Sequence, residues 1–544
     1  MQSCVTRYGP LTLIAIVAFS AAFSAARVPA QSGVESNLPE AGFGAEAAAA
    51  PTIHVYSRET IVDVLVTDAK GQPVRGLTRS DFTVEEDNKP QPIRGFYEYD
   101  KTTPPAPART LPPDTYTNAT TLPANGPVLI IYFDIPCICS YPPGSDPIAA
   151  ATVGNIFVRA KPYIADYLRT MPAGTQVAVF AYRCDYGLHL LQGFTTEGQP
   201  AAKAVDDLVI LSAGKPPSFG PIAAADQIAA YVAGIHGRKN LIWIGRPLPV
   251  LRDGGLAWGI TDMTTVHRLM DLYDIFTREQ IAIYPFHPEG VHTLGPTSGK
   301  MESLAQAQAL LANAEGPLME EAVADGTGGA TSNSNDYHGT IAKIVDDTTH
   351  YYTLSYIPPR VIDDGHYHAI KITVDRPGLH LVYRNGYNDE QPAPPDAVLQ
   401  AHLEQGPMRL GALPSTQILF DLNVQPKSPS SPAPARAKTA PYAALFTFDP
   451  TQLALAEAPD GTRTGSIEFD LGAYDSFSNL VASRSQAFKI TVKPAQYNSF
   501  LRAPLKFSLP IDLPHGQLTL HAGLFDTIAN KAGTLEIPLA IPKK

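Results

Sequence analysis

The middle of the chain carries four unbroken apolar runs separated by stretches with helical periodicity. The runs are Val128–Asp134 (VLIIYFD), Gln176–Tyr182, Asn240–Gly245 and Ile281–Phe286. Continuous apolar runs of this length are typical of parallel strands that are buried on both faces. The helical stretches expected around them are 147–171, 201–211, 221–235, 266–279, 302–314, 317–325 and 337–347. This alternation predicts an α/β fold with a doubly wound parallel sheet and right-handed crossovers, and Gly187–Phe194 would run back along an edge.

The segments on either side of this region read as β structure. Upstream and downstream, short runs rich in β-branched and aromatic residues alternate with turn signals; they are Thr60–Thr67, Phe82–Glu85, Ile93–Tyr99, Tyr351–Tyr356, His366–Val374 and Leu379–Arg384. Neither set has enough strands to bury a core alone. We therefore expect both sets to pair in one composite sandwich. From Ser415 to Pro542, roughly seven short strands predict an all-β sandwich of immunoglobulin or fibronectin type.

Proline-rich and Ala/Gly-rich segments mark the boundaries between the expected domains. Residues 101–127 hold seven prolines, which indicates a semi-rigid linker without strands or helices. The expected organisation is a signal peptide (1–30), a disordered spacer (31–52), an N-terminal β unit (53–100) that pairs with 350–388, a linker (101–127), an α/β domain (128–349), a second linker (389–414) and a C-terminal sandwich (415–544).

The charge and the N-terminal sequence indicate where the protein is located and which kind of partner is not expected. The formal net charge is −11, so nucleic acid is not expected as a partner. Arg7, the apolar stretch Leu11–Ala26 and the small-residue site Val28–Ala30 resemble a secretory signal, with an uncleaved anchor as the alternative. No other segment is long enough to span a membrane. We expect a chain in the periplasm or outside the cell, with no membrane span after signal cleavage.

Several blocks match one domain family in the same order. They are VDVLVTDAKGQPVRGLTRSDFTVEEDNKPQPI (62–93), ADGTGG (324–329), YYTLSYIPP (351–359) and DGHYHAIKITVDRPGLHLVYRNGY (364–387). Together with the strand that ends at Asp134, these blocks resemble the von Willebrand factor A (VWA)-related family of Acidobacteria over about residues 53–388. The segment 467–542 is similar to the β-sandwich that often follows. The resemblance implies a VWA-like, Rossmann-type sheet and names no activity.

The resemblance also implies that a metal site has been lost. In a metal-binding VWA domain, an aspartate, two nearby serines, a threonine and a later acidic residue supply hard oxygen ligands for Mg²⁺ or Ca²⁺. Here Asp134 remains, Pro136 and Ile138 replace the serines, and Gly245-Arg246 stands where the later acidic residue would follow. We expect no cofactor, with weak Mg²⁺ or Ca²⁺ binding as the alternative. The residues expected on the interaction loops are Asp134, Ser140, Ser218, Arg246 and His287.

Three cysteines remain after the signal segment. The VWA strand order places Gln176–Tyr182 beside Val128–Asp134, so Cys184 should lie near the loop that carries Cys137 and Cys139. Export favours disulfides. We expect Cys184 to pair with Cys137 or Cys139, and which of the two stays free is open.

Other candidate chemistry has plain structural alternatives. His366 and His368 share a strand face and could bind zinc, although such residues are more often surface residues beside a turn. The carboxylates of Glu85–Asp87 are most simply solvated. Gly326–Gly329 follows a helix and reads as a helix stop. The sequence has no Gly-x-Ser-x-Gly, His-Glu-x-x-His or phosphate-binding loop, and no local base supports a nucleophilic Cys137 or Cys139.

Two function classes remain. The favoured one is an exported, non-enzymatic module of the interaction or adhesion type that binds a protein partner through the α/β loops. The alternative is a divalent-metal-dependent adhesin or an enzyme whose site the sequence does not reveal. Binding of calcium or magnesium that depends on Asp134 would favour the alternative.

Overall fold

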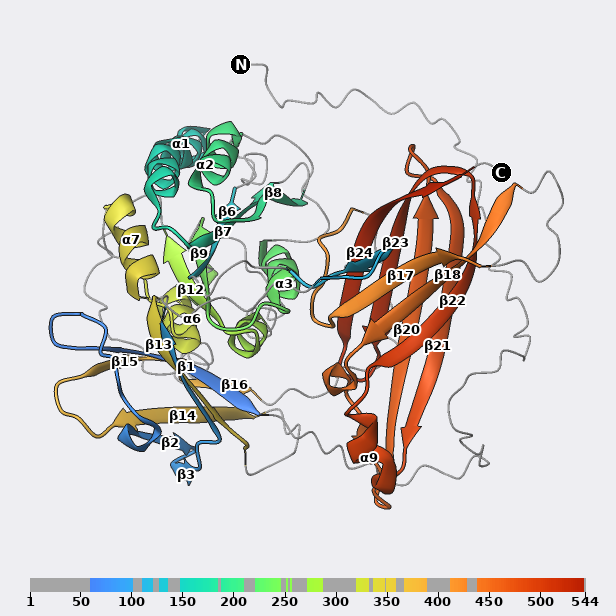
Figure 1. Cartoon of the computed structure of the whole chain (residues 1–544). Coiled ribbons are helices and arrows are strands. Elements are labelled where there is room, and N and C mark those ends of the chain that lie inside the picture. Colours follow the sequence, from blue (N-terminus) through green and yellow to red (C-terminus); the bar gives the residue numbers. More distant parts are fainter. Residues whose placement is uncertain are drawn as a thin grey trace. The chain divides into compact units, whose positions relative to one another are not determined.

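A computed structural model of the chain describes residues 59–100, 110–120, 127–135, 147–183, 187–209, 221–245, 251–252, 255–256, 272–286, 319–331, 336–347, 349–358, 366–388, 411–427 and 438–542. All of them lie in Thr52–Lys544, the larger of two units into which the chain divides. Their main sheets form an α/β body and two β-sandwiches (Figure 1).

The α/β body is built on a five-stranded sheet with the order β12-β9-β6-β7-β8. The strands β6 (Val128–Asp134), β7 (Gln176–Arg183), β9 (Lys239–Ile244) and β12 (Ile281–Phe286) are parallel, and the edge strand β8 (Gly187–Thr195) is antiparallel to β7. Nearly every residue of the parallel strands is buried. Burial on both faces explains why these strands are continuous apolar runs.

Helices pack against both faces of this sheet. One face contacts α1 (Pro147–Thr170), α2 (Gly198–Asp207) and α7 (Tyr337–Asp347). The other contacts α3 (Pro221–Val232), a helical segment at 272–278 and α6 (Met319–Thr327). The helices expected at 266–279 and 302–314 fall wholly or partly in residues 257–271 and 287–318, which lie outside the described part. The short strands β10 (Leu251–Arg252) and β11 (Gly255–Leu256) pair antiparallel with each other.

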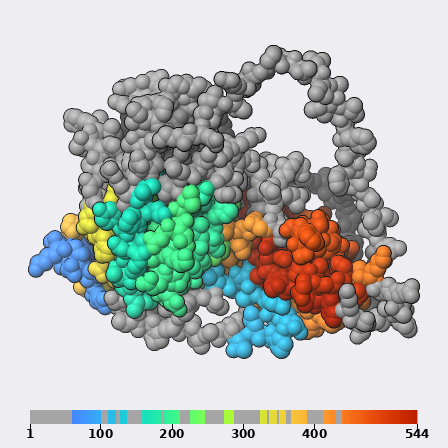
Figure 2. Space-filling view, turned by 90° about the horizontal axis from the view of Figure 1, so that it is seen from above, coloured from blue at the N-terminus to red at the C-terminus, as the bar shows by residue number. Residues whose placement is uncertain are grey.

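On the face that Figure 2 shows, the teal and green atoms, the colours of α1 and α2, gather in one area. Lys161 of α1 donates hydrogen bonds through Nζ to the carbonyl oxygens of Asp206 (2.9 Å) and Leu208 (2.6 Å), at the C-terminus of α2. A cation at the negative end of a helix is favourable. Among the described residues, no helix combines the length and apolar character needed to span a bilayer.

The first β-sandwich combines strands from before and after the α/β body. One sheet has the order β15-β1-β13-β4 and the other β16-β14-β2-β3. The core draws on both sheets, with Val62, Val64 and Phe82 packed against Tyr352 and Ile370. The elements are β1 (Thr60–Thr67), η1 (Arg79–Asp81), β2 (Phe82–Glu86), β3 (Lys89–Gln91), β4 (Gly95–Asp100), β13 (His350–Tyr356), β14 (Tyr367–Val374), β15 (His380–Val382) and β16 (Gly386–Asn388).

The run Leu379–Arg384, expected as one strand, contains the shorter strand β15, and the separate strand β16 follows just beyond its end. β15 pairs with β1, whereas β16 pairs with β14. Arg384 lies at the break; its Nη1 donates to the carbonyl oxygen of Thr277 (3.0 Å), and Asn385 N donates to the carbonyl oxygen of Gly326 (3.2 Å). These bonds turn the chain from one sheet to the other.

The C-terminal sandwich packs two sheets around one apolar core. One sheet has the order β22-β18-β17-β5; the other has β19-β20-β23-β24, with β21 on the second edge of β20. The elements are β5 (Thr115–Thr117), β17 (Phe420–Pro426), β18 (Thr439–Phe448), η3 (Pro450–Gln452), β19 (Ala456–Glu457), β20 (Arg463–Tyr474), β21 (Leu480–Val492), α9 (Pro494–Phe500), β22 (Leu505–Pro514), β23 (Gly516–Asp526) and β24 (Lys531–Ile541).

Two expectations about this sandwich were wrong. Strands β20 to β24 run for 10 to 13 residues and are not short. The proline-rich segment 101–127 contains a strand, because Thr115–Thr117 pairs with β17 as an edge strand. Asn118 then fixes the segment: its Nδ2 donates to the carbonyl oxygens of Ser415 (3.1 Å) and Ile418 (2.8 Å).

Candidate functional site

The carboxyl edge of the α/β sheet is the first candidate site. The chain passes through β7 and β8 on one side of β6 and then returns to β9 on the other side. Such a reversal is the topological switch point at which open α/β sheets bind ligands. Asp134 is the last residue of β6, is half-buried and pairs in register with Tyr182. The structure therefore places the carboxylate that the sequence singled out at this switch point.

Gly245, which directly follows β9, packs against Asp134. A Cβ atom at position 245 would lie 2.8 Å from Cβ of Asp134 and 3.2 Å from its Oδ2. A contact of 2.8 Å between two carbon atoms is a severe overlap, so position 245 has no room for a side chain in this arrangement. The later acidic ligand of a metal-binding VWA domain is expected at this position or at Arg246, and Arg246 lies outside the described residues.

Aromatic side chains lie near Asp134 on β6 itself and on the neighbouring strands β7 and β9. The ring of Tyr132 packs edge-on against Trp243, with 5.1 Å between the centroids. Burial, together with the charge of Asp134, raises the pKa of Tyr182 to about 12, so its hydroxyl stays protonated at neutral pH. Within the described residues, Asp134 belongs to no cluster of three potential metal ligands. In the described part of the chain, this edge therefore places the carboxylate of Asp134 near aromatic rings.

The other predicted residues of this face lie outside the described residues. They are the four remaining loop residues and the three cysteines of the expected disulfide: Ser140, Ser218, Arg246, His287, Cys137, Cys139 and Cys184. The parallel pairing of β6 with β7 places the ends of both strands at one edge of the sheet. The disulfide between Cys184 and Cys137 or Cys139 stays a prediction.

The Gly-Thr-Gly-Gly segment is a helix stop, as the sequence predicted. α6 ends at Thr327, and Gly328 has a φ of +78°. Gly328 N donates to the carbonyl oxygen of Asp325 (3.1 Å) and Gly329 N to that of Ala324 (2.8 Å), which is how a left-handed residue closes a helix. Ile283 N donates to Oγ1 of Thr327 (3.0 Å) and ties the end of α6 to β12.

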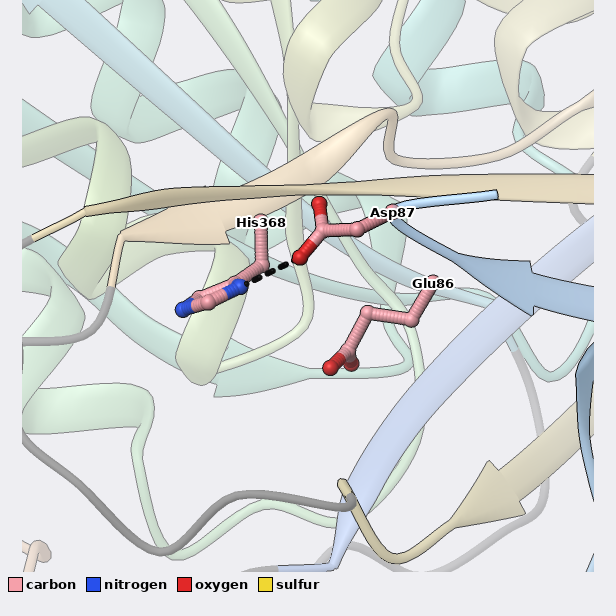
Figure 3. Close-up of side chains that lie close together, drawn as sticks. All are labelled: Glu86, Asp87 and His368. Carbon is pink, nitrogen blue, oxygen red and sulfur yellow. Dashed lines mark hydrogen bonds and ion pairs between the residues drawn. The ribbon is translucent and has the colours of Figure 1, made fainter. Parts of the chain in front are cut away.

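A second candidate site lies in the first sandwich, where Glu86, Asp87 and His368 come together (Figure 3). Each offers one potential ligand atom, and these atoms all lie within 4.8 Å of one another. Nδ1 of His368 is 2.8 Å from Oδ2 of Asp87. Glu86 and His368 are only 4% and 6% exposed, whereas the side chain of Asp87 is 45% exposed. The cluster is thus a buried pair beside a carboxylate that reaches solvent.

This arrangement corrects two expectations from the sequence. Glu86 is buried, not solvated, because β2 extends to position 86 and the alternation that buries Phe82 and Val84 also turns Glu86 inward. His368 is not a surface residue, since it shares the inward face of β14 with Ile370. His366 precedes β14 and is exposed. Strict period-two alternation was the signal that could have identified both buried residues.

Two further buried histidines each pair with a partly exposed carboxylate. Nε2 of His350 lies 2.8 Å from Oε1 of Glu98, and Nδ1 of His521 lies 3.2 Å from Oε1 of Glu536. Neither pair belongs to a cluster of three potential ligands among the described residues. They are chemically similar to the pair of His368 and Asp87 but lack a third ligand.

The comparisons with known proteins are distant. No family model and no curated protein matches the sequence. Among solved structures, the chain aligns with the hypothetical protein BatB from Bacteroides thetaiotaomicron at 13% identity and a TM-score of 0.24, over 40% of this chain and 97% of that one. It aligns with an aerotolerance-related membrane protein from Bacteroides fragilis at 12% identity and a TM-score of 0.23, over 41% and 98%.

A third match is proximal thread matrix protein 1 from the mussel byssus, in a structure with a zinc-occupied MIDAS motif. The identity is 14% and the TM-score 0.23, over 41% of this chain and 47% of that one. At these TM-scores the likenesses carry no argument about function, so the functional reasoning rests on the residues of this chain.

Proposed function

We propose that this chain is an exported, non-enzymatic protein-interaction module that binds a protein partner through the loops at the carboxyl edge of its α/β sheet. The observation that carries this proposal is the position of Asp134 at the switch point between β6 and β9. Loops at this edge are where α/β sheets present their binding residues. The sequence resemblance to the VWA-related family supports the same edge.

The packing of Gly245 against Asp134 supports binding without a metal at this edge. An acidic side chain at position 245 would collide with Asp134. Metal-binding VWA domains need several oxygen ligands around the ion, and the sequence places Pro136 and Ile138 where two serines are expected. Direct contact between the loops and a partner is then the simplest mode of recognition.

Site-specific photo-crosslinking tests this proposal. A photoreactive amino acid is placed at Ser140, which follows β6 in the sequence, and in a matched control at Gly193, on the edge strand β8. We expect one discrete crosslinked protein from the native envelope for position 140 and none for position 193. Crosslinking should persist in EDTA.

Two results would count against the proposal. Equal crosslinking from both positions would place the contact elsewhere. Loss of the crosslink in EDTA, together with a calcium-induced rise of the melting temperature that Asp134→Ala abolishes, would instead favour a metal-dependent adhesin.

A further inference from the structure

We propose that Glu86, Asp87 and His368 form a binding site for a divalent transition-metal ion in the first sandwich, away from the carboxyl edge of the α/β sheet. The three residues lie where the turn after β2 meets β14 (Figure 3). Their potential ligand atoms are within 4.8 Å of one another. Small movements of these side chains would bring all three atoms to the distances of about 2.0–2.2 Å at which zinc binds nitrogen and oxygen.

Asp87 is held in place by its own backbone and by β14. It has a φ of +50° and Asn88 a φ of +62°, so the two residues form a tight turn between β2 and β3. Asp87 N donates to the carbonyl oxygen of Ala369 (2.9 Å), and Ala369 N donates to Oδ1 of Asp87 (3.0 Å). Oδ2 is thereby directed at the imidazole of His368. Asp and Asn tolerate the left-handed region better than most residues. Asp87 can therefore occupy this turn and also direct its carboxylate at His368.

Glu86 is positioned by two tyrosines. The hydroxyl groups of Tyr356 (2.7 Å) and Tyr387 (3.0 Å) both donate to its Oε2. The ring of Tyr387 also packs against that of His368, with 5.4 Å between centroids. Outer residues that orient metal ligands in this manner are typical of metal sites.

The charge at the cluster also favours a cation. Glu86 is buried, and among the described residues no ion pair involves it. A buried carboxylate without a counter-ion is costly. The guanidinium of Arg384 lies over the ring of Tyr387, at 5.8 Å, and donates to the carbonyl oxygen of Thr277. A divalent ion would neutralise the two carboxylates directly.

The ligand set indicates the class of metal. One imidazole nitrogen with two carboxylate oxygens suits Zn²⁺, Mn²⁺ or Fe²⁺ better than Ca²⁺, which prefers six to eight oxygen ligands. The exposed side of Asp87 gives the ion a path from solvent. The bound ion would replace the hydrogen bond between Asp87 and His368 and clamp the β2–β3 turn to β14.

Calorimetric titration of the full, EDTA-treated chain with Zn²⁺ tests the site. Glu86→Gln keeps an acceptor for both tyrosines, and Asp87→Asn keeps a residue that tolerates the turn. We expect saturable binding of one ion, with the affinity at least about tenfold lower in each variant and also lower in Tyr387→Phe, which removes one orienting bond. The matched control Glu98→Gln changes the carboxylate beside His350 in the same sandwich and should bind zinc like the wild type. Melting temperatures without metal show whether each variant is folded.

Three outcomes would overturn the proposal. The first is no saturable binding by the folded wild type at zinc concentrations up to about 100 μM, since structural and catalytic zinc sites bind far more tightly. The second is unchanged affinity in folded Glu86→Gln and Asp87→Asn. The third is loss of binding in a Cys137→Ser, Cys139→Ser variant, which would assign the zinc to the cysteine loop.

Discussion

At the scale of single residues, Lys239 shows how the α/β body accommodates a buried charge. Its side chain is 1% exposed, at the start of β9. Nζ donates to the carbonyl oxygens of Ile235 (2.6 Å) and Gly237 (3.0 Å). Burial lowers the pKa of Lys239 to about 8, although the negative charges of Glu279 and Asp63 oppose the shift. The folded protein therefore binds this proton less tightly than the unfolded chain does.

This difference predicts that folding stability rises with pH above about 8. Below pH 8, Lys239 is protonated in both the folded and the unfolded state, so folding bears the full cost of burying its charge. Between pH 8 and the ordinary pKa of 10.5, the folded state has lost this proton while the unfolded state still binds it, and stability therefore rises with pH. From pH 7.5 to 10, Lys239 should add roughly 2 kcal/mol to the free energy of unfolding. Denaturant unfolding of the wild type and Lys239→Met over this range measures the effect as the difference between the two proteins. A difference that does not change with pH would contradict the prediction.

Buried tyrosines set the upper limit of the pH range over which stability should rise. Burial raises the pKa values of Tyr351 and Tyr356 far above 10, so these groups keep their protons in the folded state while the unfolded chain loses them. Their contribution is present below pH 10 and is lost at higher pH. Comparison with Lys239→Met, which retains the tyrosines, separates the two effects.

At the scale of elements, the end of α6 depends on a close approach to β12. A Cβ atom at Gly329 would lie 1.8 Å from the carbonyl oxygen of Ile283. This oxygen belongs to the backbone of a buried strand and cannot move aside independently of the sheet. The end of α6 can therefore pack this closely against β12 only because position 329 is a glycine.

We accordingly predict that Gly329→Ala destabilises the α/β body by roughly 3 kcal/mol or more, within the range of severe overpacking and backbone strain. Gly193→Ala on β8 is the control, because its added Cβ would meet nothing closer than 3.9 Å; it should change stability by less than about 0.5 kcal/mol. Denaturant midpoints of both variants provide the comparison. Equal destabilisation by the two substitutions would disprove the fit.

The sequence predicts long elements better than short ones. The apolar runs at 128–134 and 281–286 match β6 and β12, since two-sided burial leaves a continuous signature. Thr115–Thr117 carries no comparable signature; it becomes a strand because β17, some 300 residues later, supplies hydrogen bonds. The same limit applies to the metal-ligand cluster. Alternation could place Glu86 and His368 inward, but only the pairing of β2 with β14 brings them together.

At the scale of the whole molecule, the chain builds its bodies from separated segments. Thr60–Asp100 supplies strands to the first sandwich, Thr115–Thr117 then joins the C-terminal sandwich, and the chain returns to the first sandwich at His350 only after the α/β body. β13 lies between β1 and β4, so both of its neighbours come from the N-terminal segment. The return strands consequently have no complete sheet until the N-terminal strands are in place.

This connectivity predicts that two N-terminal truncations have different effects. A chain that starts at residue 101 loses both neighbours of β13, so amide protons in 350–388 should exchange rapidly, whereas the C-terminal sandwich keeps β5 and its protection. A chain that starts at residue 121 also loses β5 and Asn118, whose side chain donates to the carbonyl oxygens of Ser415 and Ile418. Exchange should then also accelerate in β17, which becomes an edge strand, while β20 and β23 stay protected in the other sheet.

Hydrogen exchange followed by mass spectrometry measures all three regions in one experiment. Two results would contradict the prediction. Protection of 350–388 that is retained in the chain starting at residue 101 would show that these strands fold without the N-terminal segment. Identical exchange of β17 in both truncated chains would show that β5 does not support the sandwich.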